Sequence, residues 1–408
     1  GPAPTYGSTE ELYSAFLQQL RETVQTLYRL TVTDTFVRTP DGGWAEGTFY
    51  ATSYTKWYLP FFCAVERYSG CRFLDRPFYQ RLTQFFLHFA SPDFENHPFG
   101  DGYWCHPSDA EWPGFFAQNP CRLYADRFGP DAARRRAADA ARQDVYLLHL
   151  LDIFIPSGSA PAVSLTGEAK NVRAFPDAGF VSLHTDLLHT ENDVALLARA
   201  SRFGSDSHRH PDQGSFALFI GGTAMISPSG YFGRQYGSKH HREWLNSTRA
   251  HNALLIDGEG QKPFSMEPRG KIVSCCDHGA AKEACLDLSE AYPMLRRWRR
   301  TFILAGKVLT ILDEVDADHP VRVTYPLHTL SRPTASGNTV TVERGTHRLT
   351  IEPLAGELGG CEITDRFAVD LNEGEPEAYH VTMPEQFHIR FTTPVRASHR
   401  IEVRFTLE

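Results

Sequence analysis

The stretch Ser207-His-Arg-His-Pro-Asp-Gln-Gly-Ser-Phe216 and the later run Arg249-Ala-His-Asn252 carry the most information in this sequence. Both read as β-structure, in which residues i and i+2 point to the same face. His208 and His210 are therefore predicted to share a face, and His251 begins a following apolar run. Histidines grouped in this way are typical of a proton carrier beside a metal or a polar anchor. Unrelated structural histidines are the alternative, which the accompanying Asp, Asn and Gln make weaker.

The order of patterns along the chain predicts two domains. At 408 residues the chain is too long for one ordinary core. The first third has helical periodicity and opens with a capping box, Ser8-Thr-Glu-Glu11. After the linker Pro156-Ser-Gly-Ser-Ala-Pro161, apolar residues alternate between turn signals, which is typical of a large antiparallel sheet or sandwich. We expect a helical domain over residues 1–160 and an antiparallel β-sandwich over 161–408.

Individual elements follow from the same patterns. In the first helix, an apolar face is marked by Leu12, Phe16 and Leu20. Later helices are expected at about Tyr54–Tyr68, Pro77–Phe89 and Asp131–Phe154. Strands are expected at Gly179–His184, Ser215–Ile220, Val308–Leu312, Asn338–Glu343 and Ile401–Thr406. The basic run Arg296–Arg300 also alternates like a strand, so its charges are expected to divide between two faces.

Composition excludes some classes of protein. The net charge is −8 and the only basic run is the alternating one, so a nucleic-acid partner is not expected. An anionic polymer stays possible because a local basic cleft is enough to bind it.

No apolar run is long enough to span a membrane. The eight cysteines show no metal-ligand spacing. Gly1-Pro2 resembles the scar of a removed tag, so a native N-terminus is not expected here.

Four segments resemble one family in their order and spacing: His208–Leu218, Ile226–Tyr231, His241–Trp244 and Arg249–Gly258. They are similar to the β-sheet domain of heparinase II/III-like polysaccharide lyases. The resemblance implies an α/α toroid, incomplete in this chain, followed by a large antiparallel β-sandwich, with the active site between them. It also implies a polysaccharide substrate that contains uronic acid, such as a glycosaminoglycan or alginate. A periplasmic or secreted location follows from family and substrate, although no signal peptide is visible.

The chemistry that the resemblance implies is β-elimination. It needs a base for the C5 proton, an acid for the leaving oxygen, and a group that neutralises the carboxylate. Trp44-Ala-Glu-Gly-Thr-Phe-Tyr50 resembles the segment that bears the family's tyrosine, which serves as acid and often as base. Tyr50 is therefore the predicted acid, and Tyr54, one helical turn later, is the second choice. His208 matches the family's catalytic histidine. For Tyr50, the wall of the groove or the core is the alternative.

A metal site is also implied, but with a departure. His210 and His251 match two ligands of a structural zinc in several family members. Ser227 stands where the family has an aspartate ligand, and serine is a poor neutral ligand for zinc. Either Asp212 is the third ligand, or the site holds no metal and its histidines are hydrogen-bonded structure. One zinc or other divalent ion is thus an open expectation.

The family's neutralising Asn or His/Glu has no counterpart here, because no Asn precedes Asn96 and no His precedes His88. The candidate substrate-binding residues are Trp104, His106, Gln213, His241 and Arg249. The alternative for each is groove lining or a structural hydrogen bond. Two other functions stay open: a uronate C5-epimerase, which shares the proton abstraction, and a non-catalytic carbohydrate-binding relative. A product with a C4–C5 double bond distinguishes the lyase from both.

Overall fold

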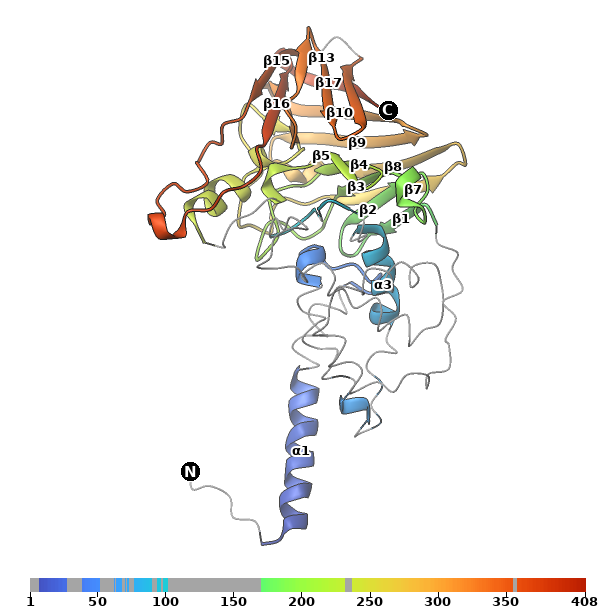
Figure 1. Ribbon diagram of the computed structural model, residues 1–408, viewed down its shortest axis with the longest axis vertical. Coiled ribbons are helices and arrows are strands. Elements are labelled where there is room, and N and C mark those ends of the chain that lie inside the picture. The colour runs from blue at the N-terminus through green and yellow to red at the C-terminus, as the bar shows by residue number, and fades with distance from the viewer. Residues whose placement is uncertain are drawn as a thin grey trace.

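The structure is a computed structural model that describes residues 7–27, 39–51, 62, 64–67, 70, 72, 77–89, 94–96, 98–101, 170–231, 237–354 and 358–408. A broad β-rich part lies above a helical N-terminal part, from which the first helix extends away (Figure 1). Of the predicted helix at Tyr54–Tyr68, residues 62 and 64–67 are described and are helical. Its other residues, the predicted helix at Asp131–Phe154 and the predicted boundary at residue 160 lie outside the described residues. The α/α toroid therefore stays a prediction.

Two long helices are described in the N-terminal part. Helix α1 (Thr9–Leu27) begins with the predicted capping box: the Ser8 hydroxyl accepts from the Glu11 N–H at 3.2 Å. The Glu11 carboxylate in turn accepts from the N–H of Gly7 at 2.8 Å. Helix α3 (Pro77–Phe89) has the predicted bounds. The apolar face expected on α1 is exposed, since Leu12 and Phe16 are 49% and 59% exposed.

The described strands form three antiparallel sheets, as the alternating pattern predicted. The five-stranded sheet contains, in spatial order, β1 (Val172–Phe175), β2 (Phe180–His184), β3 (Val194–Arg199), β4 (Phe216–Ile220) and β5 (Thr223–Ile226). The eight-stranded sheet contains β12 (Thr334–Ser336), β13 (Thr339–Arg344), β14 (His347–Pro353), β17 (Arg396–Leu407), β10 (Val308–Val321), β9 (Leu295–Ala305), β8 (Ala281–Asp287) and β7 (Lys271–Asp277). The four-stranded sheet contains β15 (Gly359–Thr364), β16 (Phe387–Thr392), β11 (Val323–Thr329) and β6 (Leu255–Ile256).

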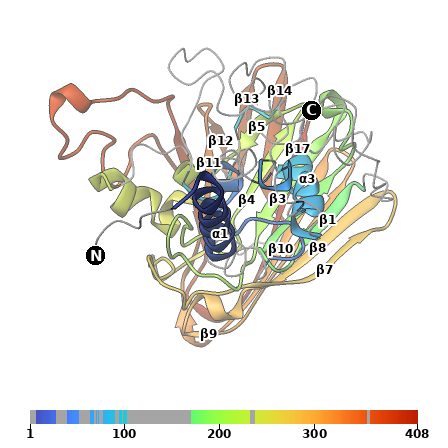
Figure 2. The ribbon, with the colours of Figure 1, turned by 90° about the horizontal axis from the view of Figure 1, so that it is seen from below.

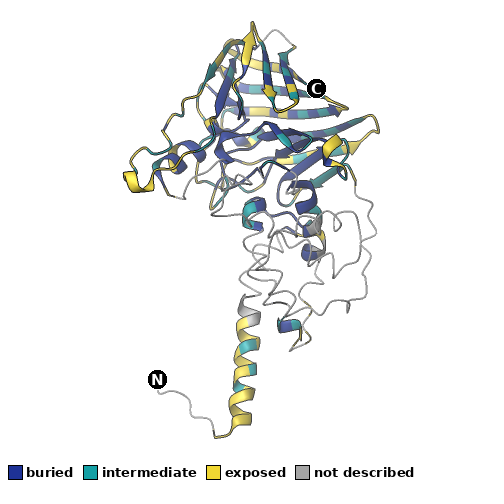
Figure 3. Ribbon diagram, viewed as in Figure 1, coloured by how far each residue is buried: buried dark blue, intermediate teal, exposed yellow. Residues whose placement is uncertain are grey.

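The five-stranded sheet is covered on both faces. Alternate residues such as Val181 and Leu218 belong to the core that is shared with the other sheets. Their neighbours Phe180 and Phe219 belong to an aromatic core that includes Phe85 of α3. Because side chains alternate between faces, every residue of β2, β3 and β4 is buried (Figure 3). Seen from below, α3 lies over this sheet (Figure 2).

The basic run of β9 divides between two faces, as predicted. Arg297 and Arg299 are exposed, whereas Arg300 is fully buried and forms a bidentate ion pair with Asp313 of β10 at 2.8 and 2.9 Å. The same guanidinium donates to the carbonyls of Gly214 at 2.7 Å and Asn252 at 2.9 Å. A buried charge needs such partners. Arg300 thereby ties together the two histidine-bearing segments that the sequence singled out.

A buried histidine pair connects β11 and β16. The Nδ1 atoms of His328 and His388 lie 2.8 Å apart, and both Nε2 atoms are buried without a hydrogen-bond partner among the described residues. Burial, which disfavours the charged ring, lowers the pKa of His388 to about 4 and lowers that of His328 as well. Both rings are therefore neutral in the folded protein at neutral pH.

We expect this pair to make the folded state less stable in mild acid. Above a pH of about 6.5 the rings are neutral in both the folded and the unfolded protein. Below that pH, of about 6.5, His388 binds a proton in the unfolded chain but stays neutral in the folded protein. Each such group lowers the free energy of unfolding by about 1.4 kcal/mol per pH unit until its folded pKa is reached. Denaturant titrations between pH 7.5 and 5 measure this slope. His388→Gln should reduce the slope, and exchange of the exposed His319 for Gln should leave it unchanged; equal slopes in all three proteins would contradict the expectation.

Candidate active site

The first histidine segment is a loop, so the prediction that it is β-structure was wrong. Residues 201–215 contain turns and bends, and the strand β4 begins only at Phe216. Ser207 has a positive φ of 59°, which reverses the chain before His208. His251 likewise ends a short 3-10 helix, η7 (Thr248–Ala250), rather than lying on a strand. The histidines therefore come together through the conformation of the loops. The i, i+2 alternation of a strand is not what positions them.

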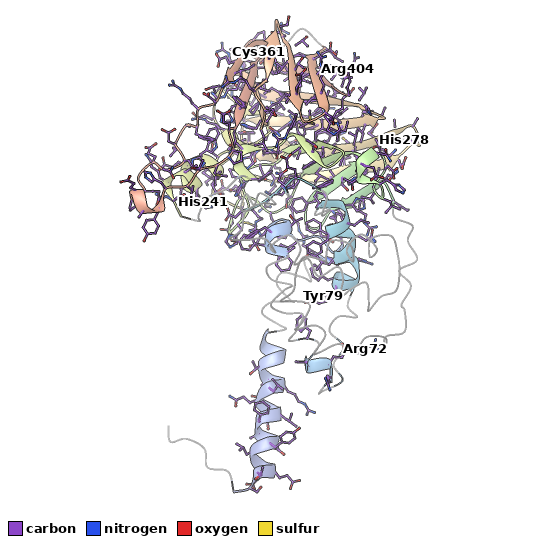
Figure 4. The ribbon with its side chains drawn as sticks, viewed as in Figure 1. Arg72, Tyr79, His241, His278, Cys361 and Arg404 are labelled. Atoms are coloured by element: carbon purple, nitrogen blue, oxygen red, sulfur yellow. The ribbon has the colours of Figure 1, made fainter. Side chains whose placement is uncertain are left out.

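Three histidines converge on one carboxylate, that of Asp101. Its Oδ2 lies 2.8 Å from Nδ1 of His208. Its Oδ1 lies 2.9 Å from Nε2 of His210 and 2.8 Å from Nε2 of His241. His241 begins the π-helical turn η6 (His241–Leu245), at the lower margin of the β-rich part (Figure 4). Burial disfavours the charge on Asp101, but the hydrogen bonds from these histidines outweigh it and hold its pKa well below the usual range.

Two glycines allow the Asp101 segment to approach the segments that carry Tyr50 and His208. A Cβ at Gly47 would lie 1.9 Å from the carbonyl oxygen of Phe99, and one at Gly100 would lie 1.9 Å from that of Glu46. Both glycines have positive φ, which disfavours other residues. The N–H of Asp101 donates to the carbonyl of His208 at 2.9 Å. The segment 98–101 thus lies between the turn that leads to Tyr50 and the loop that carries His208.

The structure brings Tyr50 and His208 together. Their rings stack with centroids 3.7 Å apart and an interplanar angle of 16°. The His208 side chain is 22% exposed, and Tyr50 is partly buried. A phenol and an imidazole held face to face can transfer protons to or from neighbouring atoms of one substrate. Tyr54, the second choice for the acid, lies outside the described residues.

His210 and His251 face each other inside the protein. Nδ1 of His210 lies 3.0 Å from Nε2 of His251, whose Nδ1 lies 2.8 Å from the carbonyl of Ser247. Burial and then the charge of His210 lower the pKa of His251 to about 3, so its ring is neutral and Nε2 holds the lone pair. Gly230 accommodates this ring, because a Cβ there would lie 2.3 Å from it.

These contacts place a proton between the two rings. His210 must donate from Nδ1 to the lone pair of His251, and from Nε2 to the ionised carboxylate of Asp101. Both ring nitrogens of the buried His210 therefore have a partner inside the protein, as buried polar groups require.

The third ligand that zinc would need is engaged elsewhere. Asp212 forms a buried ion pair with Arg199, and its second oxygen accepts from the Tyr231 hydroxyl at 2.5 Å. The hydroxyl of Ser227 accepts from the amide of Asn96 at 3.0 Å. In the described part of the chain, no group of three or more His, Cys, Asp or Glu side chains is arranged to hold a metal ion. These residues fit a hydrogen bond between two imidazoles and do not fit the three or four ligands of a zinc site.

We therefore expect chelation to leave the protein unchanged. Dialysis against a strong chelator should not alter the melting temperature, and elemental analysis should find far less than one zinc per chain. A bound structural zinc would instead stabilise the folded state, so that its removal would lower the melting temperature. About one metal per chain together with such a decrease would restore His210 and His251 as ligands.

The predicted substrate-binding residues lie in different surroundings. Gln213 is buried: its side-chain oxygen accepts from the Ser201 N–H at 2.7 Å, and its side-chain nitrogen donates to the Phe203 carbonyl at 3.0 Å. We leave it out of the proposed substrate site, because its amide supports the loop. Arg249 is 43% exposed and donates to the carbonyl of Gly258 at 3.1 Å.

The remaining candidates are His241, which bonds to Asp101, and Trp104 and His106, which lie outside the described residues. Sequence reasoning missed Asp101 altogether. The signal it did leave is the run Pro98-Phe-Gly-Asp101, in which a glycine directly precedes a carboxylate within an aromatic-rich loop. Such a glycine marks a close backbone approach.

A sequence model of the family described as heparinase II/III-like, C-terminal, matches residues 167–403. The fold is similar to that of the heparan sulfate lyase HepC from Pedobacter heparinus, with a TM-score of 0.68 at 16% identity over 96% of this chain and 56% of that one. Heparinase III gives a TM-score of 0.59 at 15% identity over 90% of this chain and 54% of that one. The chain spans a little over half the length of these proteins. No curated protein matches the sequence.

Proposed function

Because the chain belongs to the heparinase II/III-like family, we propose that it takes part in cleaving a uronic-acid-containing polysaccharide by β-elimination. The observation that supports this most strongly is the stacked pair of Tyr50 and His208, held beside the buried anion Asp101. The pair unites a residue of the helical N-terminal part with a residue of the β-rich part. A site built from both parts is what the family resemblance implies.

The proposed reaction needs a base, an acid and a group that neutralises the substrate carboxylate. The C5–H bond breaks and its electron pair forms the C4–C5 double bond, while the C4–O4 bond breaks and the leaving oxygen takes up a proton. The reaction needs no oxidant, reductant or second substrate. The C5 proton is weakly acidic next to an ionised carboxylate, so positioned proton carriers supply much of the rate.

In this proposal His208 is the base and Tyr50 is the acid. The bond from Nδ1 of His208 to Asp101 leaves the lone pair of the neutral ring on Nε2, which can accept the C5 proton. The phenol of Tyr50 stacks on this ring and can donate to the leaving oxygen. Arg249, with its exposed guanidinium, and His241 stay predicted contacts of the substrate carboxylate.

The substrate class is proposed from the relatives. HepC is described as a heparan sulfate lyase, so a glycosaminoglycan is the first class of polymer to test and alginate is the second. A location outside the cytoplasm, where such polymers occur, belongs to the same proposal. Among the described residues, no helix is long and apolar enough to cross a membrane.

A panel of uronate polymers tests the proposal. Purified protein is incubated with heparan sulfate, heparin, chondroitin sulfate, hyaluronan and alginate, and the ultraviolet absorbance of the C4–C5 unsaturated product is followed. We expect absorbance to rise with at least one polymer, together with a fall in its chain length. Cleavage without absorbance would indicate hydrolysis, and exchange of the C5 proton with solvent deuterium without cleavage would indicate epimerisation. Either result, or no reaction with any polymer, would overturn the proposal.

A further inference from the structure

We propose that Asp101 is a positioning residue that selects the tautomer of His208 in which Nε2 is the base. The inference rests on the proposed function, because it concerns the same site. Asp101 does not need to touch the substrate for this role. It acts through the 2.8 Å contact between its Oδ2 and Nδ1 of His208.

The carboxylate is fixed by more than this one contact. Its other oxygen, Oδ1, accepts from Nε2 of His210 and from Nε2 of His241. Nδ1 of His241 accepts from the N–H of Gly237 at 3.3 Å, and its Nε2, which also lies 3.2 Å from the side-chain nitrogen of Asn246, faces the ionised carboxylate as a donor. Asp101 also donates its own N–H to the carbonyl of His208. Both the orientation of the carboxylate and its distance from the His208 ring are therefore set by the protein.

The charge of Asp101 determines which nitrogen of His208 is protonated. An ionised carboxylate only accepts hydrogen bonds, so the nitrogen that faces it must be an N–H. In a neutral imidazole this places the lone pair on the opposite nitrogen, Nε2. The same arrangement, in which a carboxylate orients a histidine base, is the established way to hold a catalytic tautomer.

Replacement of Asp101 by asparagine should reverse that tautomer. An asparagine side chain has one accepting oxygen and one donating NH₂ group. The oxygen should stay with His210 and His241, because turning the amide would lose two hydrogen bonds and keep only one. The NH₂ group then faces Nδ1 of His208, which must become the acceptor. The hydrogen moves to Nε2, and the nitrogen that should take the substrate proton no longer has a lone pair.

A kinetic comparison separates positioning from general support of the fold. We expect Asp101→Asn to lower kcat about 10⁴-fold, the order that a wrong tautomer costs a histidine base, with KM changed by less than about threefold. The matched control is Asp193→Asn, since Asp193 is also a buried carboxylate paired with Nδ1 of a histidine, His184, at 2.6 Å. The control should lose stability and keep kcat. A proportional loss of kcat in both variants would overturn the proposal.

A spectroscopic measurement tests the same proposal without turnover. In protein labelled with ¹⁵N-histidine, long-range ¹H–¹⁵N correlations at a pH where the ring is neutral show which nitrogen carries hydrogen, and His208→Gln identifies the signal. Wild-type His208 should be protonated at Nδ1, and Asp101→Asn should move the hydrogen to Nε2. A wild-type ring protonated at Nε2 overturns the proposal. This readout does not depend on any polymer. It therefore still tests the role of Asp101 if the proposed function proves wrong.

Discussion

Replacing Tyr50 by phenylalanine is expected to lower kcat about 10⁴-fold, at the upper end of what a positioned proton carrier contributes. The change removes one oxygen and keeps the ring, so the stacking on His208 at 3.7 Å should persist. Without the phenol, no proton reaches the leaving oxygen as the C4–O4 bond breaks. Substrate affinity should change little, because a group that acts in the transition state contributes to kcat far more than to binding.

The measurement compares initial rates from ultraviolet absorbance with binding of the same polymer by calorimetry. Tyr292→Phe is the matched control: its hydroxyl donates to the Leu254 carbonyl at 2.6 Å inside the β-rich part. It should cost about 1–3 kcal/mol of stability through an unpaired carbonyl and leave kcat unchanged. Near-normal turnover in Tyr50→Phe, combined with loss of turnover in Tyr54→Phe, would move the acid by one helical turn.

Much of the fold could be predicted because strands and helices leave periodic patterns. The bounds of α3 and the strand segments Phe180–His184 and Phe216–Ile220 were predicted within a residue, since helical periodicity marks the first and short apolar runs between turn signals mark the strands. The capping box of α1 was predicted for the same reason, because its hydrogen bonds join near neighbours in the chain. In each of these cases, interactions between residues close in the sequence were sufficient to predict the element.

The candidate site was harder to predict from the sequence than the fold. The expected strand at His208 was wrong, because a positive φ at Ser207 and the turns around it have no periodic signal. Asp101 was missed because its partners are more than a hundred residues away in the chain, and only the fold brings them to one carboxylate. Asp212 was considered as a metal ligand, but its buried partner Arg199 lies on a strand whose pattern shows only burial. Long-range polar contacts of this kind have no local pattern.

The two histidines of the His208-Arg-His210 segment are expected to differ in what their loss does. His208→Ala should lower kcat about 10⁴-fold, because the base is gone, and cost only about 1 kcal/mol of stability, since its ring is partly exposed. His210→Ala should lower kcat and also cost about 3 kcal/mol. Its ring is buried, and its removal leaves a lone pair of His251 and part of the Asp101 charge unpaired.

Turnover and melting temperature, measured on the same preparations, test this contrast. His189→Ala is the control, because that imidazole is 63% exposed and pairs only with Asp186 among the described residues, so both readouts should stay at wild-type values. Unfolding of His208→Ala beside a stable His210→Ala would mean that the two roles are reversed. The contrast follows from the contacts: both ring nitrogens of His210 bind buried partners, His251 and Asp101, whereas Nδ1 of the partly exposed His208 binds Asp101 and the proposed function assigns its Nε2 to the substrate. In the proposed function, one loop therefore supplies both a buried structural histidine and a catalytic base.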